Sequence, residues 1–204
     1  VVKIDKEESI YEITDNQNNV YKTKVIINCA GVFADEVHNM IAQPSYKIHA
    51  KRGQYFVMDK YEGEKINSVI FQCPTKDGKG VLVTPTVHGN LLLGPDSEEI
   101  DDKYNTATTT EQLEYVKERA LKSVQNINTR EVIRSFAGLR AEADRGDFVI
   151  EEVASAKGFI DVGGIKSPGL SAAPAIAVDV AQMTLNYLGQ VEKNETFNPI
   201  RKKQ

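Results

Sequence analysis

The segment Gly163–Pro174 constrains the possible folds of this 204-residue chain most strongly, because its first seven residues hold three glycines and one proline. It follows the apolar stretch Phe159–Val162 and leads into small residues that favour a helix. We therefore expect a strand, a turn with little side-chain bulk and the start of a helix in succession. Free N–H groups and the positive end of the helix dipole suit an anion, or an electron-rich ring held close to the main chain.

The hydrophobic patterns along the chain predict an α+β fold with a mixed, mainly antiparallel sheet. Glycine, proline and aspartate separate most strand-like segments, which favours short antiparallel connections. A hairpin and a further strand are expected over residues 1–28, and helices at 32–41, 111–124 and 171–189. Further strands are expected at 48–58, 68–71, 80–84, 90–93, 131–139, 148–153 and 159–162.

Local signals add detail to three of these elements. The apolar run Val25–Ile27 is expected to be buried. Threonines 108–110 supply N-caps for the helix at 111–124. Pro174 is expected in the first turn of the last helix, where a missing N–H is tolerated.

The composition argues against several classes of partner. The chain is 41% hydrophobic and 26% charged with a net charge of −4, and no basic stripe points to nucleic acid. No apolar run approaches the roughly 20 residues of a membrane-spanning helix, so membrane contact is not indicated. Cys29 and Cys73 are far apart, which indicates neither a disulfide framework nor a metal site and favours a cytoplasmic protein.

Several catalytic motifs are absent from the sequence. It contains no GxGxxG, Walker, GxSxG or HExxH pattern. Nucleophilic hydrolysis and ATP chemistry therefore find no support in the residues. The chain begins at Val1 in the style of a strand and without methionine, and we expect it to be a segment of a longer polypeptide.

Two arginines are candidates for binding an anion. Arg140 ends an apolar, glycine-containing strand, and its planar guanidinium matches a carboxylate or phosphate. The alternative for Arg140 is a salt bridge to a nearby acid such as Glu142 or Asp144. Arg52 opens another strand, where it is either a second anion contact or a solvated charge.

Other candidates each have a structural alternative. His49 and His88 could accept a proton, but a structural hydrogen bond or a surface turn explains them equally well. Lys166 faces either a ligand's negative charge or water. Ala30 and Gly31 follow a buried strand, so they either let the backbone approach a flat ligand or simply form a tight turn.

Five segments occur in an order that resembles a known family. They span residues 25–35, 52–55, 85–95, 136–140 and 164–174. Together they resemble the FAD-dependent oxidoreductases of the D-amino-acid oxidase superfamily. Within it they look most like the anaerobic-type glycerol-3-phosphate dehydrogenases and the L-2-hydroxyglutarate oxidases.

The resemblance implies a division into parts of a flavoenzyme. The family places an N-terminal Rossmann unit, whose GxGxxG receives the FAD pyrophosphate, before the region seen here. Residues 1–43 would then be the late part of the FAD-binding domain, 44–150 a substrate-binding domain and 151–204 the return to the FAD-binding domain. The chain alone is expected to bind FAD weakly or not at all, because the pyrophosphate site is missing.

The resemblance also implies roles for single residues. Arg140, with Arg52 as a second contact, would hold the anionic group of the substrate. His49 or His88 would take the hydroxyl proton. The residues expected beside the flavin are Ala30, Gly31, Gly164, Ile165, Lys166, Ser167, Gly169 and Leu170.

The activity implied is oxidation of glycerol 3-phosphate by hydride transfer to flavin. The alternatives are L-2-hydroxyglutarate, another small 2-hydroxy or amino acid such as glycine or sarcosine, and a non-catalytic ligand-binding module. The expected partners are a small anionic hydroxy compound and an electron acceptor. Self-association is also expected, because apolar surface facing the missing part would be exposed.

Overall fold

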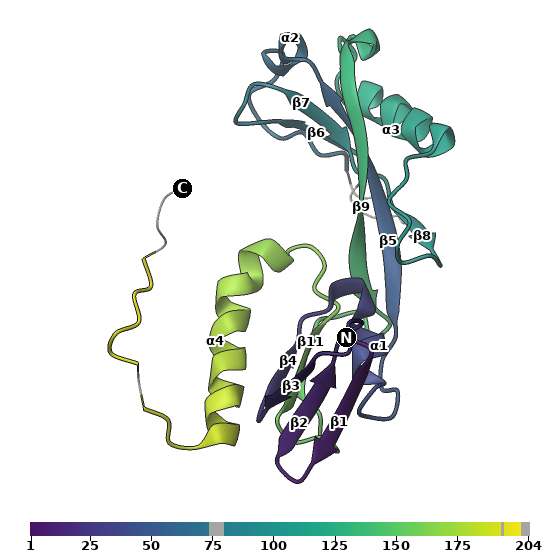
Figure 1. Ribbon diagram of the computed structural model, residues 1–204. Helices are drawn as coiled ribbons and strands as arrows, with labels where there is room; N and C mark the ends of the chain where they lie inside the picture. Colours follow the sequence, from purple (N-terminus) through teal and green to yellow (C-terminus); the bar gives the residue numbers. More distant parts are fainter. Residues whose placement is uncertain (74–79, 193, 201–204) are drawn as a thin grey trace.

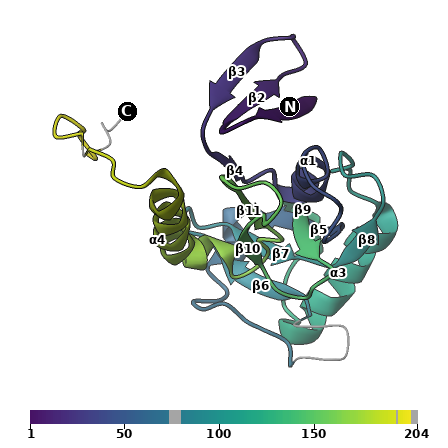
Figure 2. The same ribbon diagram turned by 90° about the horizontal axis from the view of Figure 1, so that it is seen from below.

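The computed structural model describes residues 1–73, 80–192 and 194–200, whose strands form three sheets (Figure 1). The first is an antiparallel meander that projects away from the rest of the chain in Figure 2. In the second, one strand pair is parallel and the other antiparallel. The strands of these two sheets are β1 (Lys3–Glu7), β2 (Ile10–Thr14) and β3 (Val20–Thr23), then β10 (Val149–Glu152), β11 (Phe159–Gly163) and β4 (Ile26–Asn28).

Two long strands, β5 (Ile48–Met58) and β9 (Val132–Ala143), dominate the third sheet. They pair antiparallel along the whole length of β5. In Figure 1 this ribbon joins the end of the molecule that holds β6 and β7 to the end that holds β4 and β11. The remaining strands of the sheet are β6 (Leu82–Pro85), β7 (Leu91–Gly94) and β8 (Glu98–Ile100).

The helices cover the sheets from several sides. Thr109 caps the helix α3 by accepting a hydrogen bond from the N–H of Gln112 at 3.4 Å, as expected from the threonines there. None of the helices among the described residues is long and apolar enough to cross a membrane. The helical segments are η1 (Gly31–Phe33), α1 (Ala34–His38), α2 (Lys60–Gly63), α3 (Thr110–Ser123), η2 (Thr129–Glu131) and α4 (Gly169–Leu188).

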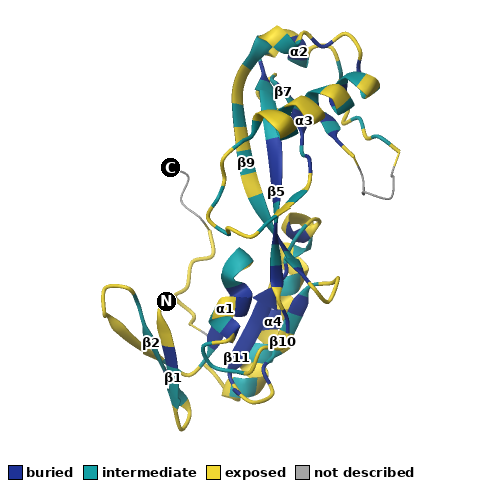
Figure 3. Cartoon of the chain, turned by 90° about the vertical axis from the view of Figure 1, so that its right-hand side faces the viewer, coloured by how far each residue is buried: buried dark blue, intermediate teal, exposed yellow. Residues whose placement is uncertain are grey.

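Alternate side chains of β11 point to opposite faces of its sheet, and a different helix packs on each face. Ile160 and Val162 pack with Val180 of α4 on one face. Phe159 and Asp161 point to the opposite face, where α1 lies. All five residues of β11 are buried, so the strand is dark blue along its length in Figure 3. The strand therefore forms the centre of this half of the fold.

Asp161 is fully buried and collects three hydrogen bonds from distant parts of the chain. It accepts from Asn28 Nδ2 on β4 at 2.8 Å, from Tyr46 Oη at 3.1 Å and from His38 Nδ1 on α1 at 2.6 Å. Burial and the neighbouring carboxylate of Asp161 raise the pKa of the Tyr46 hydroxyl. Since Asn28 is also the register partner of Asp161, this network fixes β4 and β11 side by side at their carboxyl ends.

Most of the expected elements are confirmed, with several corrections. Residues 48–58 form a strand as predicted, whereas Ser68–Phe71 contributes just the isolated bridge Ile70–Val83. Ile27 is 45% exposed, so the run Val25–Ile27 is not wholly buried. The predicted strand 131–139 continues to Ala143, which places Arg140 inside a strand rather than at its end.

The last helix also differs from the prediction. It begins at Gly169, so Pro174 is the sixth helical residue and lies beyond the first turn. Pro174 has no N–H to donate to the carbonyl of Leu170, four residues earlier. A domain boundary near residue 43 and another near 150 stay predictions.

We predict that Asp161→Ala destabilises the chain by about 3–5 kcal/mol, because it leaves buried donors of Asn28, His38 and Tyr46 without their acceptor. The measurement is the free energy of unfolding from denaturant titration followed by circular dichroism. The control is Asp179→Ala on the exposed side of α4, which should change stability by less than about 0.5 kcal/mol. Equal unfolding midpoints for the two variants would contradict the role of this network.

Candidate functional site

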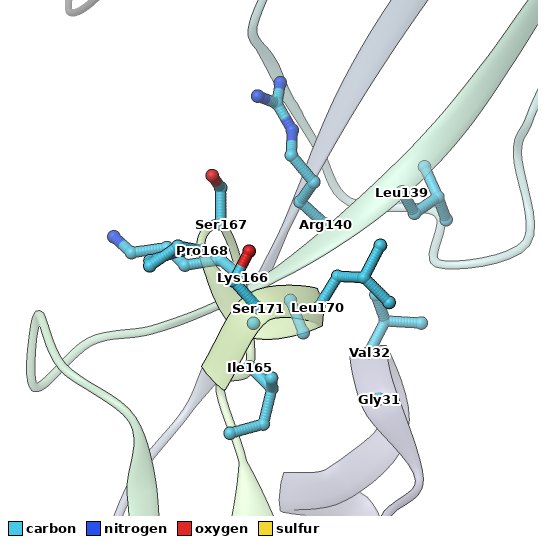
Figure 4. A pocket seen from close by; sticks show the side chains of 12 residues that line it. Gly31, Val32, Leu139, Arg140, Ile165, Lys166, Ser167, Pro168, Leu170 and Ser171 are labelled. Carbon is cyan, nitrogen blue, oxygen red and sulfur yellow. The ribbon is translucent and has the colours of Figure 1, made fainter. Parts of the chain in front are cut away.

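A pocket of about 480 Å³ lies where the carboxyl ends of β4 and β11 face β9 (Figure 4). Three separate parts of the chain form its walls. They are the turn after β4, residues 139–141 of β9 and the turn that leads from β11 into α4. The lining residues are Gly31, Val32, Leu139, Arg140, Ala141 and all of residues 165–171.

The turn after β4 presents bare main chain to the pocket. Gly31 has a φ of 60°, a conformation that residues with side chains rarely adopt. A Cβ built on Gly31 would meet no atom of the described residues within 4 Å, so the space beside it is open. The glycine is therefore required by the backbone, and it also lets a ligand approach the main chain closely.

The turn after β11 is held against β9. Gly164 has a φ of 65°, and a Cβ there would lie 2.8 Å from the Cβ of Ala143. The chain then enters α4 through hydrogen bonds from Lys166 N to Gly164 O at 2.9 Å and from Gly169 N to Lys166 O at 2.6 Å. Leu170 is 94% exposed at the start of the helix. The expected succession of strand, bare turn and helix is confirmed.

Lys166 is paired with a residue of the sheet. Its ammonium donates to Glu142 on β9, and the other oxygen of Glu142 lies 3.9 Å from Lys51 Nζ. The hydrogen bond from Lys166 holds the pKa of the Glu142 carboxyl below its usual value. This pair ties the turn after β11 to the sheet.

Arg140 projects from the interior of β9 into the pocket. Its Nη2 donates to the carbonyl oxygen of Asp96 at 2.8 Å and, more weakly, to that of Arg52 at 3.5 Å. Among the described residues Arg140 forms no salt bridge to Glu142 or Asp144, which was its alternative role, and Glu142 pairs with Lys166 instead. In Figure 4 the guanidinium of Arg140 and the hydroxyl of Ser167 point to the same side of the pocket.

Two features beside Arg140 escaped the sequence analysis. The rings of Tyr55 and Phe136 stack at 4.9 Å with an interplanar angle of 7°. Gly53 and Gly138 are the next cross-strand pair on the same face, between these rings and Arg140. Within the part of the chain that the structure describes, a Cβ on Gly138 would meet no atom within 4 Å, so the surface between the rings and the guanidinium is open. Alternation along β5 and β9 could have indicated this shared face if their register had been known.

Other predicted site residues lie outside the pocket lining. Arg52 is 4% exposed and on the opposite face, where it binds Glu98 Oε2 at 2.6 Å and the carbonyl of Ala107 at 2.9 Å. His49 Nδ1 contacts Glu99 Oε1 at 2.7 Å. His88 lies in the turn between β6 and β7.

The structure thus brings together seven of the predicted residues and leaves five outside the lining. Ala30 and Gly164 adjoin lining residues along the chain. His49, His88 and Arg52 are elsewhere on the third sheet. The predicted residues that line the pocket are Gly31, Arg140, Ile165, Lys166, Ser167, Gly169 and Leu170.

Two curated relatives match nearly the whole chain. The chain is 50% identical to a glycerol 3-phosphate dehydrogenase of Caloramator mitchellensis over 202 residues, which are 99% of this chain and 42% of the relative. It is 34% identical to a glycerol 3-phosphate oxidase of Mycoplasma genitalium over 201 residues, covering 97% of this chain and 52% of the relative. The chain therefore spans about half the length of these curated relatives.

A solved structure and a family model complete the comparison. The dithionite-reduced L-α-glycerophosphate oxidase of Mycoplasma pneumoniae with FAD bound superposes with a TM-score of 0.83 at 31% identity. The match covers 90% of this chain and 49% of that structure. The model of the FAD dependent oxidoreductase family named DAO matches residues 1–183. The chain accordingly belongs to this family of FAD-dependent oxidoreductases.

Proposed function

We propose that the protein formed with this chain oxidises glycerol 3-phosphate with FAD as its cofactor. The observation that carries the proposal is the guanidinium of Arg140 in a pocket whose other walls are the turn at Gly31 and the turn at residues 165–171. The relatives named as glycerol 3-phosphate dehydrogenase and oxidase support the choice of substrate. An oxidation of this kind also requires an electron acceptor as a partner.

The residues of the pocket fit a flavin ring. Gly31 leaves open space beside the main chain, and Val32, Leu139, Ile165 and Leu170 supply apolar surface. We propose that Gly31 and residues 165–170 hold the ring. When bound, FAD supplies an acceptor for the hydride that leaves the substrate carbon.

Arg140 is proposed to hold the phosphate of the substrate. A guanidinium offers two parallel N–H groups to an oxyanion, and such charge-assisted bonds are the strong ones. Ser167 lies on the same side and would add a hydroxyl donor. The open surface above Gly138 would leave room for the carbon chain, with the stacked rings of Tyr55 and Phe136 as its boundary.

We assign the hydroxyl proton to neither of the predicted histidines. Neither His49 nor His88 belongs to the residues that line the pocket. His38 is buried against Asp161 and serves the fold. Arg140 would bind the carboxylate of L-2-hydroxyglutarate by the same donors, so that compound stays the second candidate substrate.

The test of the substrate role is Arg140→Ala in an FAD-loaded polypeptide of the relatives' full length that contains these 204 residues. We expect KM for glycerol 3-phosphate to rise about 10- to 100-fold, because a charge-assisted contact to the substrate is lost. The control is Arg134→Ala, an exposed arginine on the same strand, whose KM should not change. Wild-type KM in the Arg140 variant would rule out Arg140 as the anion anchor.

A second prediction concerns the flavin wall. Gly31→Ala should weaken FAD binding at least about tenfold, because the new methyl group would occupy the open space beside the main chain. Gly146→Ala is the matched control, since Gly146 also has a positive φ and no atom near its Cβ position but lies outside the pocket. The backbone strain is similar in both variants, so equal FAD dissociation constants, measured by fluorescence titration, would place the flavin elsewhere.

A further inference from the structure

We propose that Asp96 is the residue that positions Arg140 and sets the charge of the anion site. This inference rests on the proposed function, in which Arg140 holds the anionic group of the substrate. Asp96 lies two residues after Gly94, the last residue of β7, on a turn that lies against β5. It touches Arg140 and not the pocket itself, so it would act through the arginine.

Asp96 joins the main chain of β5 to the side chain of Arg140. The residue is 4% exposed, and its Oδ1 accepts a hydrogen bond from Gln54 N at 2.5 Å. Its carbonyl oxygen accepts from Arg140 Nη2 at 2.8 Å. The side-chain bond therefore fixes the backbone of the turn, and the backbone of the turn holds the guanidinium.

Close packing leaves the guanidinium little freedom. A Cβ on Gly53 would lie 2.9 Å from Pro95 Cβ and 3.2 Å from Arg140 Nη2. A Cβ on Gly94, whose φ is 134°, would lie 2.6 Å from the carbonyl oxygen of Gln54. The glycines at both positions thus let the turn pack directly against β5, and the guanidinium of Arg140 lies next to this contact.

The carboxylate of Asp96 also affects the charge of the site. Its Oδ2 and the Nε of Arg140 are both buried, and neither has a hydrogen-bond partner among the residues that the structure describes. Burial raises the pKa of Asp96, while the nearby charge of Arg140 acts in the opposite direction. The carboxylate of Asp96 offsets the cost of burying the charge of Arg140 and leaves the N–H groups of the guanidinium that face the pocket free. It also repels an anion that enters the pocket.

Two substitutions separate the positioning and charge effects. Asp96→Asn keeps an oxygen acceptor for Gln54 N and removes the negative charge. Asp96→Ala removes both the acceptor and the charge. Asp101→Asn is the control, because it makes the same change of charge at an exposed position of the following loop.

The experiment measures the dissociation constant of inorganic phosphate by calorimetry, and KM and kcat for glycerol 3-phosphate, in the FAD-loaded protein of the relatives' length. We expect Asp96→Asn to lower the dissociation constant and KM about three- to tenfold, because repulsion of the anion is removed. We expect Asp96→Ala to raise both by a similar net factor, because release of the arginine weakens anion binding more than loss of the charge strengthens it, while kcat changes less. Asp101→Asn should leave all three values unchanged.

Changes of the same sign and size in both Asp96 variants, or no change in either, would overturn the proposal. If Asp96→Ala does not fold, Asp96→Asn alone tests the proposal: a lower dissociation constant for phosphate supports it, and an unchanged or higher one overturns it. Arg140→Ala separates this proposal from the proposed function. Weak binding in Arg140→Ala together with unaltered binding in the Asp96 variants rejects the role of Asp96 alone, whereas unaltered binding in Arg140→Ala rejects both.

Discussion

The buried carboxylate of Asp161 holds together the part of the structure on which the pocket depends. It binds Asn28, its register partner on the parallel strand β4, and it also binds α1 through His38. Parallel strands that are aligned in this way bring the turns after their carboxyl ends to the same edge of the sheet. The bare turn at Gly31 and the glycine turn at Gly164 therefore face one pocket although they are far apart in sequence.

The pairing of β5 with β9 supplies the third wall of that pocket. The register places the stacked aromatic pair, the glycine pair and Arg140 in succession along one face of the ribbon. Gly138 leaves open space above the strand, whereas Gly53 permits the turn with Asp96 to pack closely against β5. That turn holds Arg140 through the carbonyl oxygen of Asp96. One face of a two-stranded ribbon thus combines an anion-binding group, open space and the support of that group.

The sequence predicted the local features of the fold better than its long-range pairings. The glycine turn at 163–169, the strand at 48–58 and the helix near 111–124 follow from turn chemistry and periodicity, and all three are present. Arg52 was predicted as a second anion contact beside Arg140, yet side-chain alternation and strand register put the two arginines on opposite faces. The partners of Asp161 and Asp96 lie more than 40 positions away, so no local pattern could reveal their roles.

The most direct test of the account is the visible flavin spectrum under anaerobic conditions in the protein of the relatives' length. Glycerol 3-phosphate, L-2-hydroxyglutarate and glycine are added separately to the FAD-loaded protein. The account predicts that glycerol 3-phosphate bleaches the flavin band and that glycine does not. A flavin band that stays unchanged with glycerol 3-phosphate, or is bleached by glycine alone, would contradict the proposed oxidation of glycerol 3-phosphate.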